Sequence, residues 1–342
     1  MAAAAGRDAR REMQLNAALA ASLKYSRGAV AEIEASGTKA LQIAESCDDI
    51  EHQLRSLWHL WSLRISSGQH RAALTMAERF QALAAKRSDS SDRVSGERML
   101  GVSRYYLGDL LNARRHLERV LAYDVTPART WQFVRVQVDP RAGARAFHSR
   151  ILWLQGLPDQ AMRSAESSVA EARATHHAAS LGLPLAAAAC PIALWFGDLA
   201  AAERYVDMLL DQSTTHGLAR WSSFGRCYQG LIAIRRGDVT TGLRLLRDAS
   251  DEPAAAGSAT RLSASLISAA SRHAGQIADG LPAIEEAIVR SEFTEERWLI
   301  AEVLRVKGEI LLWRGAPGAA AEAESQLCRA GNARHNADTG RH

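Results

Sequence analysis

The feature of this 342-residue chain that most constrains its fold is a glycine that returns about every forty residues. The intervals between successive glycines are 40, 48, 41, 40, 38 and 40 residues. A period of this size is typical of stacked supersecondary units, which bury their apolar faces only against their neighbours. The glycines that define it are Gly68, Gly108, Gly156, Gly197, Gly237, Gly275 and Gly315.

Small residues recur at fixed distances from these glycines. An alanine or glycine stands five residues after each of them, and an apolar residue stands nine residues after six of the seven. The two offsets differ by four, so both positions lie on one helix face. We therefore predict helix–turn–helix units in which the glycine ends the first helix in the left-handed conformation. Asp109, Asp198 and Asp238 directly follow their glycines and are expected to cap the second helix.

The composition fits an all-helical chain with a substantial core. Hydrophobic residues make up 47% of it, aromatic residues only 6%, and alternating β-branched runs are scarce. The apolar stretch 181–196 is expected to form a buried helix. We predict an all-α fold, a right-handed superhelix of about seven to eight helix pairs. Residues 1–10 are expected to be a disordered N-terminus, 11–324 the helical array and 325–342 an irregular tail, because the repeat pattern decays after Gly315.

The motifs that would indicate catalysis or a cofactor do not occur in this sequence. It has no G-x-x-x-x-G-K-[ST] phosphate loop and no C-x-x-C pair. Adjacent His176 and His177 would diverge by about 100° on a helix, so they do not form a metal pair. The prediction is therefore a non-enzyme without catalytic residues, cofactor or metal.

Charge and hydropathy limit the partners further. The net charge is only +4, and the cations are scattered rather than gathered in the basic stripe of a nucleic-acid-binding protein. The sequence has no run of 18 apolar residues and no apolar core of a signal peptide near its start. We expect a cytoplasmic protein with no membrane segment and no direct nucleic-acid partner.

Two stretches resemble the tetratricopeptide repeat. "LGVSRYYLGDLLNARRHLERVL" (100–121) and "GLIAIRRGDVTTGLRLL" (230–246) carry its G-D-x-x-x-A-like signature, with a glycine seven residues before the turn. The period is nearer 40 than 34 residues and no proline closes the second helix. The longer period implies longer helices. HEAT-type units share the longer period and are the alternative fold.

A wider resemblance covers most of the chain. "MQLNAALAASLKYSRG", "LWHLWSLRISSGQHRAALTMAERF", "FVRVQVDPRAGARAF" and "ILWLQGLPDQAM" follow one another in this order. The order resembles the C-terminal repeat region of large bacterial signalling ATPases, which carry an adenylate cyclase or a winged-helix DNA-binding domain. The resemblance implies a chain that corresponds to the repeat region alone, with a fragment, a split gene and a frame-shifted remnant as the alternatives.

The resemblance to the tetratricopeptide repeat implies that the first helices of the units line a concave groove that binds a peptide or a helix. Arginine and aromatic side chains in such a groove suit carboxylates and acidic peptides. The alternative is that each arginine is only solvated on a helix surface. The expected groove residues are Arg55, Trp58, Arg98, Tyr105, Arg150, Trp153, Arg235, Arg272, Arg305 and Glu309.

Two functional hypotheses follow. The first is a protein–protein interaction scaffold that acts as the sensor arm of a signal-transduction ATPase or transcriptional regulator, with an ATPase, cyclase or DNA-binding module as its partner. The second is a free-standing adaptor that binds a peptide or a protein terminus in the groove. Direct nucleic-acid binding through arginine would require affinity for duplex DNA that falls steeply with salt.

Overall fold

The computed structural model describes residues 8, 10–19, 30–123, 139–175, 177–250, 277–315 and 317–339. Within these ranges all regular structure is helical, so the predicted all-α superhelix of helix pairs is confirmed. The helices are α2 (Val30–Ser46), α3 (Ile50–Ser67), α4 (His70–Ala84), α5 (Ser90–Tyr106), α6 (Leu110–Ala122), α8 (Pro140–Leu154), α9 (Pro158–Ala174), α10 (Ala178–Pro184), α11 (Cys190–Phe196), α12 (Leu199–Thr215), α13 (Ala219–Arg235), α14 (Val239–Ser250), α16 (Ile277–Thr294), α17 (Ile300–Arg314) and α18 (Ala319–Thr339).

The turn glycines join the two helices of each pair. Positive φ angles of 60–94° occur at Gly68, Gly108, Gly156, Gly197, Gly237 and Gly315, whereas Gly275 lies outside the described residues. Only glycine adopts this region without a steric penalty. The three aspartates that follow such glycines accept hydrogen bonds from backbone N–H groups three residues later, those of Asn112, Ala201 and Thr241. Each cap satisfies a donor that the first turn of a helix leaves free.

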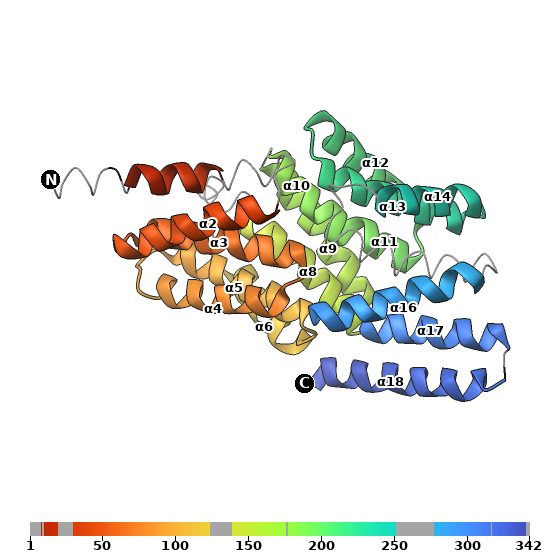
Figure 1. Cartoon of the computed structure of the whole chain (residues 1–342). Coiled ribbons are helices and arrows are strands. Elements are labelled where there is room, and N and C mark those ends of the chain that lie inside the picture. The colour runs from red at the N-terminus through yellow and green to blue at the C-terminus, as the bar shows by residue number, and fades with distance from the viewer. Residues whose placement is uncertain are drawn as a thin grey trace.

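The pairs stack into an array that turns back on itself (Figure 1). Helices α2–α6 lie at one end, α8–α11 form the middle, and α12–α14 and α16–α18 make up the other side. The last helix, α18, runs antiparallel to α17 and returns to contact α6. The C-terminal units therefore lie beside the N-terminal ones.

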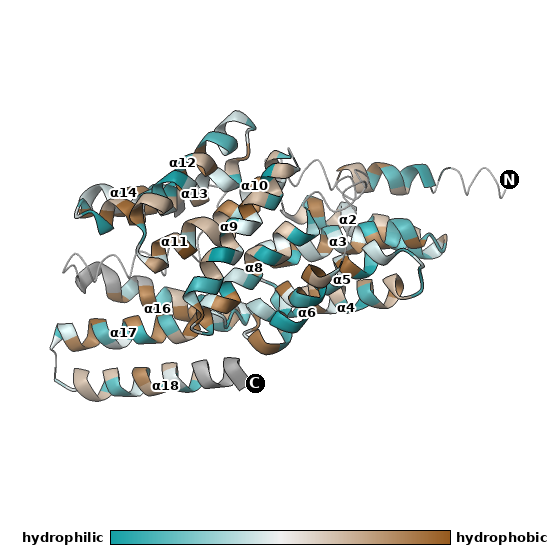
Figure 2. Ribbon diagram, turned by 180° about the vertical axis from the view of Figure 1, so that it is seen from behind, coloured by the Kyte–Doolittle hydropathy of each residue, from teal (hydrophilic) through white to brown (hydrophobic). Residues whose placement is uncertain are grey.

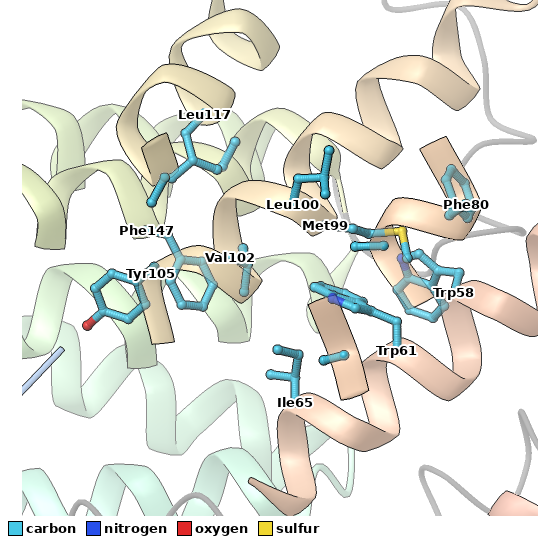
Figure 3. Packing of buried hydrophobic residues seen from close by; sticks show 14 of the residues in the cluster. Trp58, Trp61, Ile65, Phe80, Met99, Leu100, Val102, Tyr105, Leu117 and Phe147 are labelled. Carbon is cyan, nitrogen blue, oxygen red and sulfur yellow. The ribbon is translucent and has the colours of Figure 1, made fainter. Parts of the chain in front are cut away.

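The largest core lies among α3, α4, α5, α6 and α8. Figure 3 shows Trp58, Trp61, Phe80 and Met99 packed at one end of this cluster and Tyr105 beside Phe147 at the other. The alanines five residues after the turn glycines are fully buried at 73, 113, 161 and 202. Small residues there let the second helix approach the first, as the spacing predicts.

The outer faces are polar, and many arginines pair with acids on the neighbouring helix. Figure 2 shows hydrophobic and hydrophilic residues alternating along α17. Between helices, Arg64 pairs with Glu34 at 2.6 Å and Arg145 with Glu171 at 2.8 Å. These pairs neutralise cations that would otherwise contribute to a basic surface.

Two segments differ from the sequence-based expectation. The buried stretch 181–196 is not one regular helix, because a π-helical turn, η1 (Leu185–Ala189), separates α10 from α11. The irregular tail expected from residue 325 is wrong for 325–339, which belong to α18. That helix begins Ala-Ala-Ala-Glu-Ala-Glu, and alanine has the strongest helix propensity, so a helix forms where the apolar period fades.

His148 on α8 is a titratable side chain at the contact between α6, α8 and α9. Its Nε2 lies 3.6 Å from Glu118 Oε1, and its Nδ1 lies 3.4 Å from Ser164 Oγ. Burial lowers the pKa of His148, although Glu118 opposes this effect. The fold thus favours the neutral ring. Stability is fully present above the unfolded-state pKa of about 6.5 and is lost as pH falls from there through the lower folded-state pKa.

We expect the free energy of unfolding, measured by urea titration, to fall between pH 8 and 5.5. The fall should be smaller in a His148→Gln variant, which cannot titrate. It should not vanish, because burial also lowers the pKa of His177. Equal pH dependence of the two proteins would contradict the assignment to His148.

Candidate partner-binding site

The expected groove residues do not form one open surface. Exposed fractions are only 2% for Trp58, 5% for Arg98, 0% for Tyr105 and 7% for Arg150. Arg55, Trp153, Arg305 and Glu309 are half-buried, Arg235 is exposed, and Arg272 lies outside the described residues. Of the nine described positions that the repeat offsets place in a groove, the array therefore buries four, and only Arg235 is fully exposed.

Two of these residues have structural partners on their own side of the array. Arg98 on α5 lies over the Trp61 ring, with its guanidinium carbon 5.7 Å from the ring centroid. Burial lowers the pKa of Arg98 to about 10. Arg305 forms ion pairs along α17 with Glu302 and Glu309. Arg98 therefore packs in the core, and Arg305 is neutralised on its own helix.

Arg150 and Tyr105 meet in the interior of the superhelix. The Arg150 guanidinium carbon lies 4.2 Å from the centroid of Trp298, 5.5 Å from that of Tyr105 and 5.7 Å from that of Trp195. These rings come from the segment before α17, from α5 and from α11. Three elements distant in sequence thus surround one buried cation.

Arg150 forms no ion pair with the described residues, although the nearby carboxylate of Glu296 favours its charged form. Its Nε makes no hydrogen bond to the described residues either. Burial opposes the charged form, yet the pKa of Arg150 is raised by its neighbours, with Tyr105 the strongest. Removing an ion from water costs several kcal/mol. A cation–π contact returns only about 2 kcal/mol when desolvated.

Trp298 reaches Arg150 because residues 295–299 enter the concave side of the array. The backbone N–H of Arg297 donates to the Tyr106 carbonyl at 2.8 Å. The Trp298 Nε1–H donates to Glu296 Oε1 at 2.7 Å, and Glu296 Oε2 lies 3.8 Å from His70 Nε2. We name residues 295–299 the closing segment. It joins the C-terminal units to α4 and α5.

The closing segment cannot be recognised from the amino-acid sequence. The period places Trp298 within a first helix, but α17 begins at Ile300, so Trp298 lies in the turn before it. No motif marks the stretch Glu295-Glu296-Arg297-Trp298. Its role depends on where the array returns to its own start, and no local pattern encodes that contact.

Behind the closing segment lies a pocket with a cavity volume of about 80 Å³. Arg150, Arg220 and Arg290 supply its positive charge, and Glu296 is the single acid in its lining. Arg220 donates from Nη1 to Ser66 Oγ at 2.7 Å, and Arg290 pairs with Glu286. The other lining residues are mostly apolar or aromatic: Tyr106, Phe147, Leu183, Ala186, Ala187, Trp221, Phe224, Tyr228, Ala287, Ser291, Trp298 and Leu299.

Other chemistry is sparse in the part of the chain that the structure describes. No group of three or more His, Cys, Asp or Glu side chains there is arranged to hold a metal ion. The buried Cys190 has its pKa raised by desolvation, so it stays a thiol. No helix in the described ranges is long and apolar enough to cross a membrane. The pocket at Arg150 is therefore the strongest candidate site.

No family model matches the sequence, and no curated protein matches it. Solved structures do resemble its fold. A Rap protein complexed with competence and sporulation factor superposes with a TM-score of 0.63 at 9% identity, covering 97% of this chain and 99% of the other.

Two further structures have lower scores. The APC/C hetero-tetramer Cut9–Hcn1 has a TM-score of 0.52 at 15% identity, covering 89% of this chain and 53% of that one. The third structure, from Pyrococcus horikoshii, is a signal transduction ATPase with numerous domains and a tetratricopeptide repeat sensor. It has a TM-score of 0.50 at 11% identity, and the match covers 90% of this chain and 44% of that one. At such identities the likeness concerns the fold. This chain has the fold of a tetratricopeptide-type superhelix.

Proposed function

We propose that this chain is a non-catalytic interaction scaffold that senses a protein or peptide in its concave interior. One observation carries the proposal: the interior pocket is lined at once by early units, through Tyr106 and Phe147, and by the last units, through Trp298. An occupant would act at the place where the two ends of the array meet. Its binding energy would therefore differ between closed and open arrangements of the ends, which is the requirement for a sensor.

We further propose that the signal passes to an ATPase, in a cyclase-type or winged-helix-type regulator. Two observations support this. The segment order resembles the repeat region of such bacterial proteins, and the Pyrococcus horikoshii neighbour is described as a signal transduction ATPase with a tetratricopeptide repeat sensor. A cytoplasmic location belongs to the same proposal.

The test begins with translation of the DNA on both sides of the coding sequence in all frames. We expect a phosphate-loop ATPase encoded immediately upstream. When this chain is purified together with that module, the rate at which the module hydrolyses ATP should change at least threefold. This chain alone should hydrolyse no ATP. An unchanged rate would contradict the sensor role, and specific hydrolysis by the chain alone would contradict the non-enzyme role.

The second candidate is a free-standing adaptor for a peptide or protein terminus. The buried cation Arg150 favours it, because a terminus supplies a carboxylate. Unrelated neighbouring genes would favour this function over the sensor. Arg98 and Tyr105 are unsuitable for testing it, because both are core residues whose replacement would disturb the fold.

A further inference from the structure

The inference concerns the ligand of the interior pocket and rests on the proposed sensing function. Arg150 lines the pocket, and only 7% of its surface is exposed. It forms no ion pair with the described side chains, and its Nε makes no hydrogen bond to them. Aromatic rings lie close to its guanidinium. The two indole rings carry no oxygen acceptor, and the neutral Tyr105 hydroxyl makes no hydrogen bond with the described residues. What the Arg150 guanidinium lacks is a negatively charged acceptor at ion-pair distance, because Glu296, the acid in the lining, accepts from Trp298 instead.

The rest of the lining narrows the class of anion. The lining contains three arginines and one acid, so positively charged residues are in excess. Phe147, Trp221 and Phe224 form apolar parts of its wall. A strongly hydrated dianion such as phosphate would lose its water against these walls, whereas a carboxylate presents two oxygens in one plane and can carry an apolar group.

The size of the pocket adds a condition. Its volume of about 80 Å³ is roughly half that of an engineered cavity of about 150 Å³ that accommodates benzene. An aromatic or branched aliphatic group therefore needs more room. Trp298 is the large side chain against Arg150 that belongs to a turn rather than a helix, and it covers the guanidinium at 4.2 Å. A ligand of this size would take the place of the Trp298 ring.

We propose that the pocket binds an apolar or aromatic carboxylate, which pairs with Arg150 and displaces Trp298. The acid is either a small free molecule or the C-terminus of a peptide, since both present the same group. Displacement would separate the closing segment from the early units and so open the array.

The experiment uses the full chain and calorimetric titration with N-acetylphenylalanine as the probe. N-acetylphenylalaninamide is the matched control, since it has the same ring without the charge. We expect the acid to bind at least tenfold more tightly than the amide. Equal binding of the two, no binding of the acid, or tighter binding of inorganic phosphate would overturn the proposal.

Variants test the two residues separately. Arg150→Gln should weaken binding of the acid at least tenfold, whereas Arg305→Gln, which changes an arginine outside the pocket, should leave it unchanged. Trp298→Ala should tighten binding severalfold, because it removes the competing ring. If Arg150→Gln fails to fold, the variants Arg150→Lys and Trp298→Ala still test the proposal. Unchanged affinity of Arg150→Lys for the acid would contradict it, and so would weaker affinity of Trp298→Ala.

A pentapeptide ending in a free phenylalanine distinguishes the two sources. Affinity more than tenfold above that of N-acetylphenylalanine would assign the site to a peptide terminus, and equal affinity to a small acid; both support a carboxylate site. The result is independent of the ATPase test. Carboxylate binding without any effect on the ATPase would reject the sensor function alone.

Discussion

Replacement of Trp61 with alanine should lower the free energy of unfolding by about 3–5 kcal/mol, the usual cost of removing a buried tryptophan. Trp61 is 3% exposed in the largest core, where it packs near Trp58 and under the guanidinium of Arg98. Its Nε1–H donates to Ser103 Oγ at 2.9 Å. That hydroxyl also donates to the Met99 carbonyl, so it keeps a partner in the variant and the loss comes mainly from packing.

Trp313 is the matched control. It lies on α17 and is 58% exposed, so the same change should alter the free energy of unfolding by no more than about 0.5 kcal/mol. Urea titrations followed by far-UV circular dichroism measure both variants. Similar losses at the two positions would show that the core among α3, α5 and α8 does not hold the array together.

The second large effect is expected at Gly242, where α14 crosses α13. A Cβ atom there would lie 2.6 Å from the Gly230 carbonyl oxygen, a backbone atom that moves only if the two helices separate. We expect Gly242→Ala to lower the free energy of unfolding by about 2 kcal/mol, within the range for an overpacked core. Thermal and urea unfolding measure the loss.

At Gly331, the same substitution should not lower the free energy of unfolding. Gly331 lies in α18, and a Cβ atom there would meet nothing within 4 Å. Alanine exceeds glycine in helix propensity by up to about 1 kcal/mol, so Gly331→Ala should leave stability unchanged or raise it. A loss at Gly331 as large as that at Gly242 would show that the close helix contact is not the cause.

The spacing of glycines and small residues predicted the fold because both act locally. A helix hairpin needs a left-handed residue at its turn and a small residue at its crossing, whatever the rest of the chain does. The positive φ at Gly108 and the buried Ala113 fulfil these two requirements.

The site was less accessible to sequence reasoning. The groove offsets belong to a 34-residue repeat, whereas helices here reach 17 residues in α5 and 18 in α3. Longer helices shift which positions face inward, and Tyr105 and Arg98 lie in the core. Arg150 was among the expected residues, but its contact with Trp298 joins positions 148 residues apart. Such a contact depends on the accumulated rotation of all the units between them.

The return of the last units to the first also changes how this array should unfold. An open row of repeats loses its units one after another from its ends, since each unit touches only its neighbours. Here the Arg297 N–H bonds to the Tyr106 carbonyl, and Arg220 reaches Ser66. These contacts close the row of repeats into a ring, so the units between them have no free end. Unfolding of the C-terminal units thus exposes the N-terminal core. While the ring stays closed, the repeats should therefore unfold together as one cooperative unit.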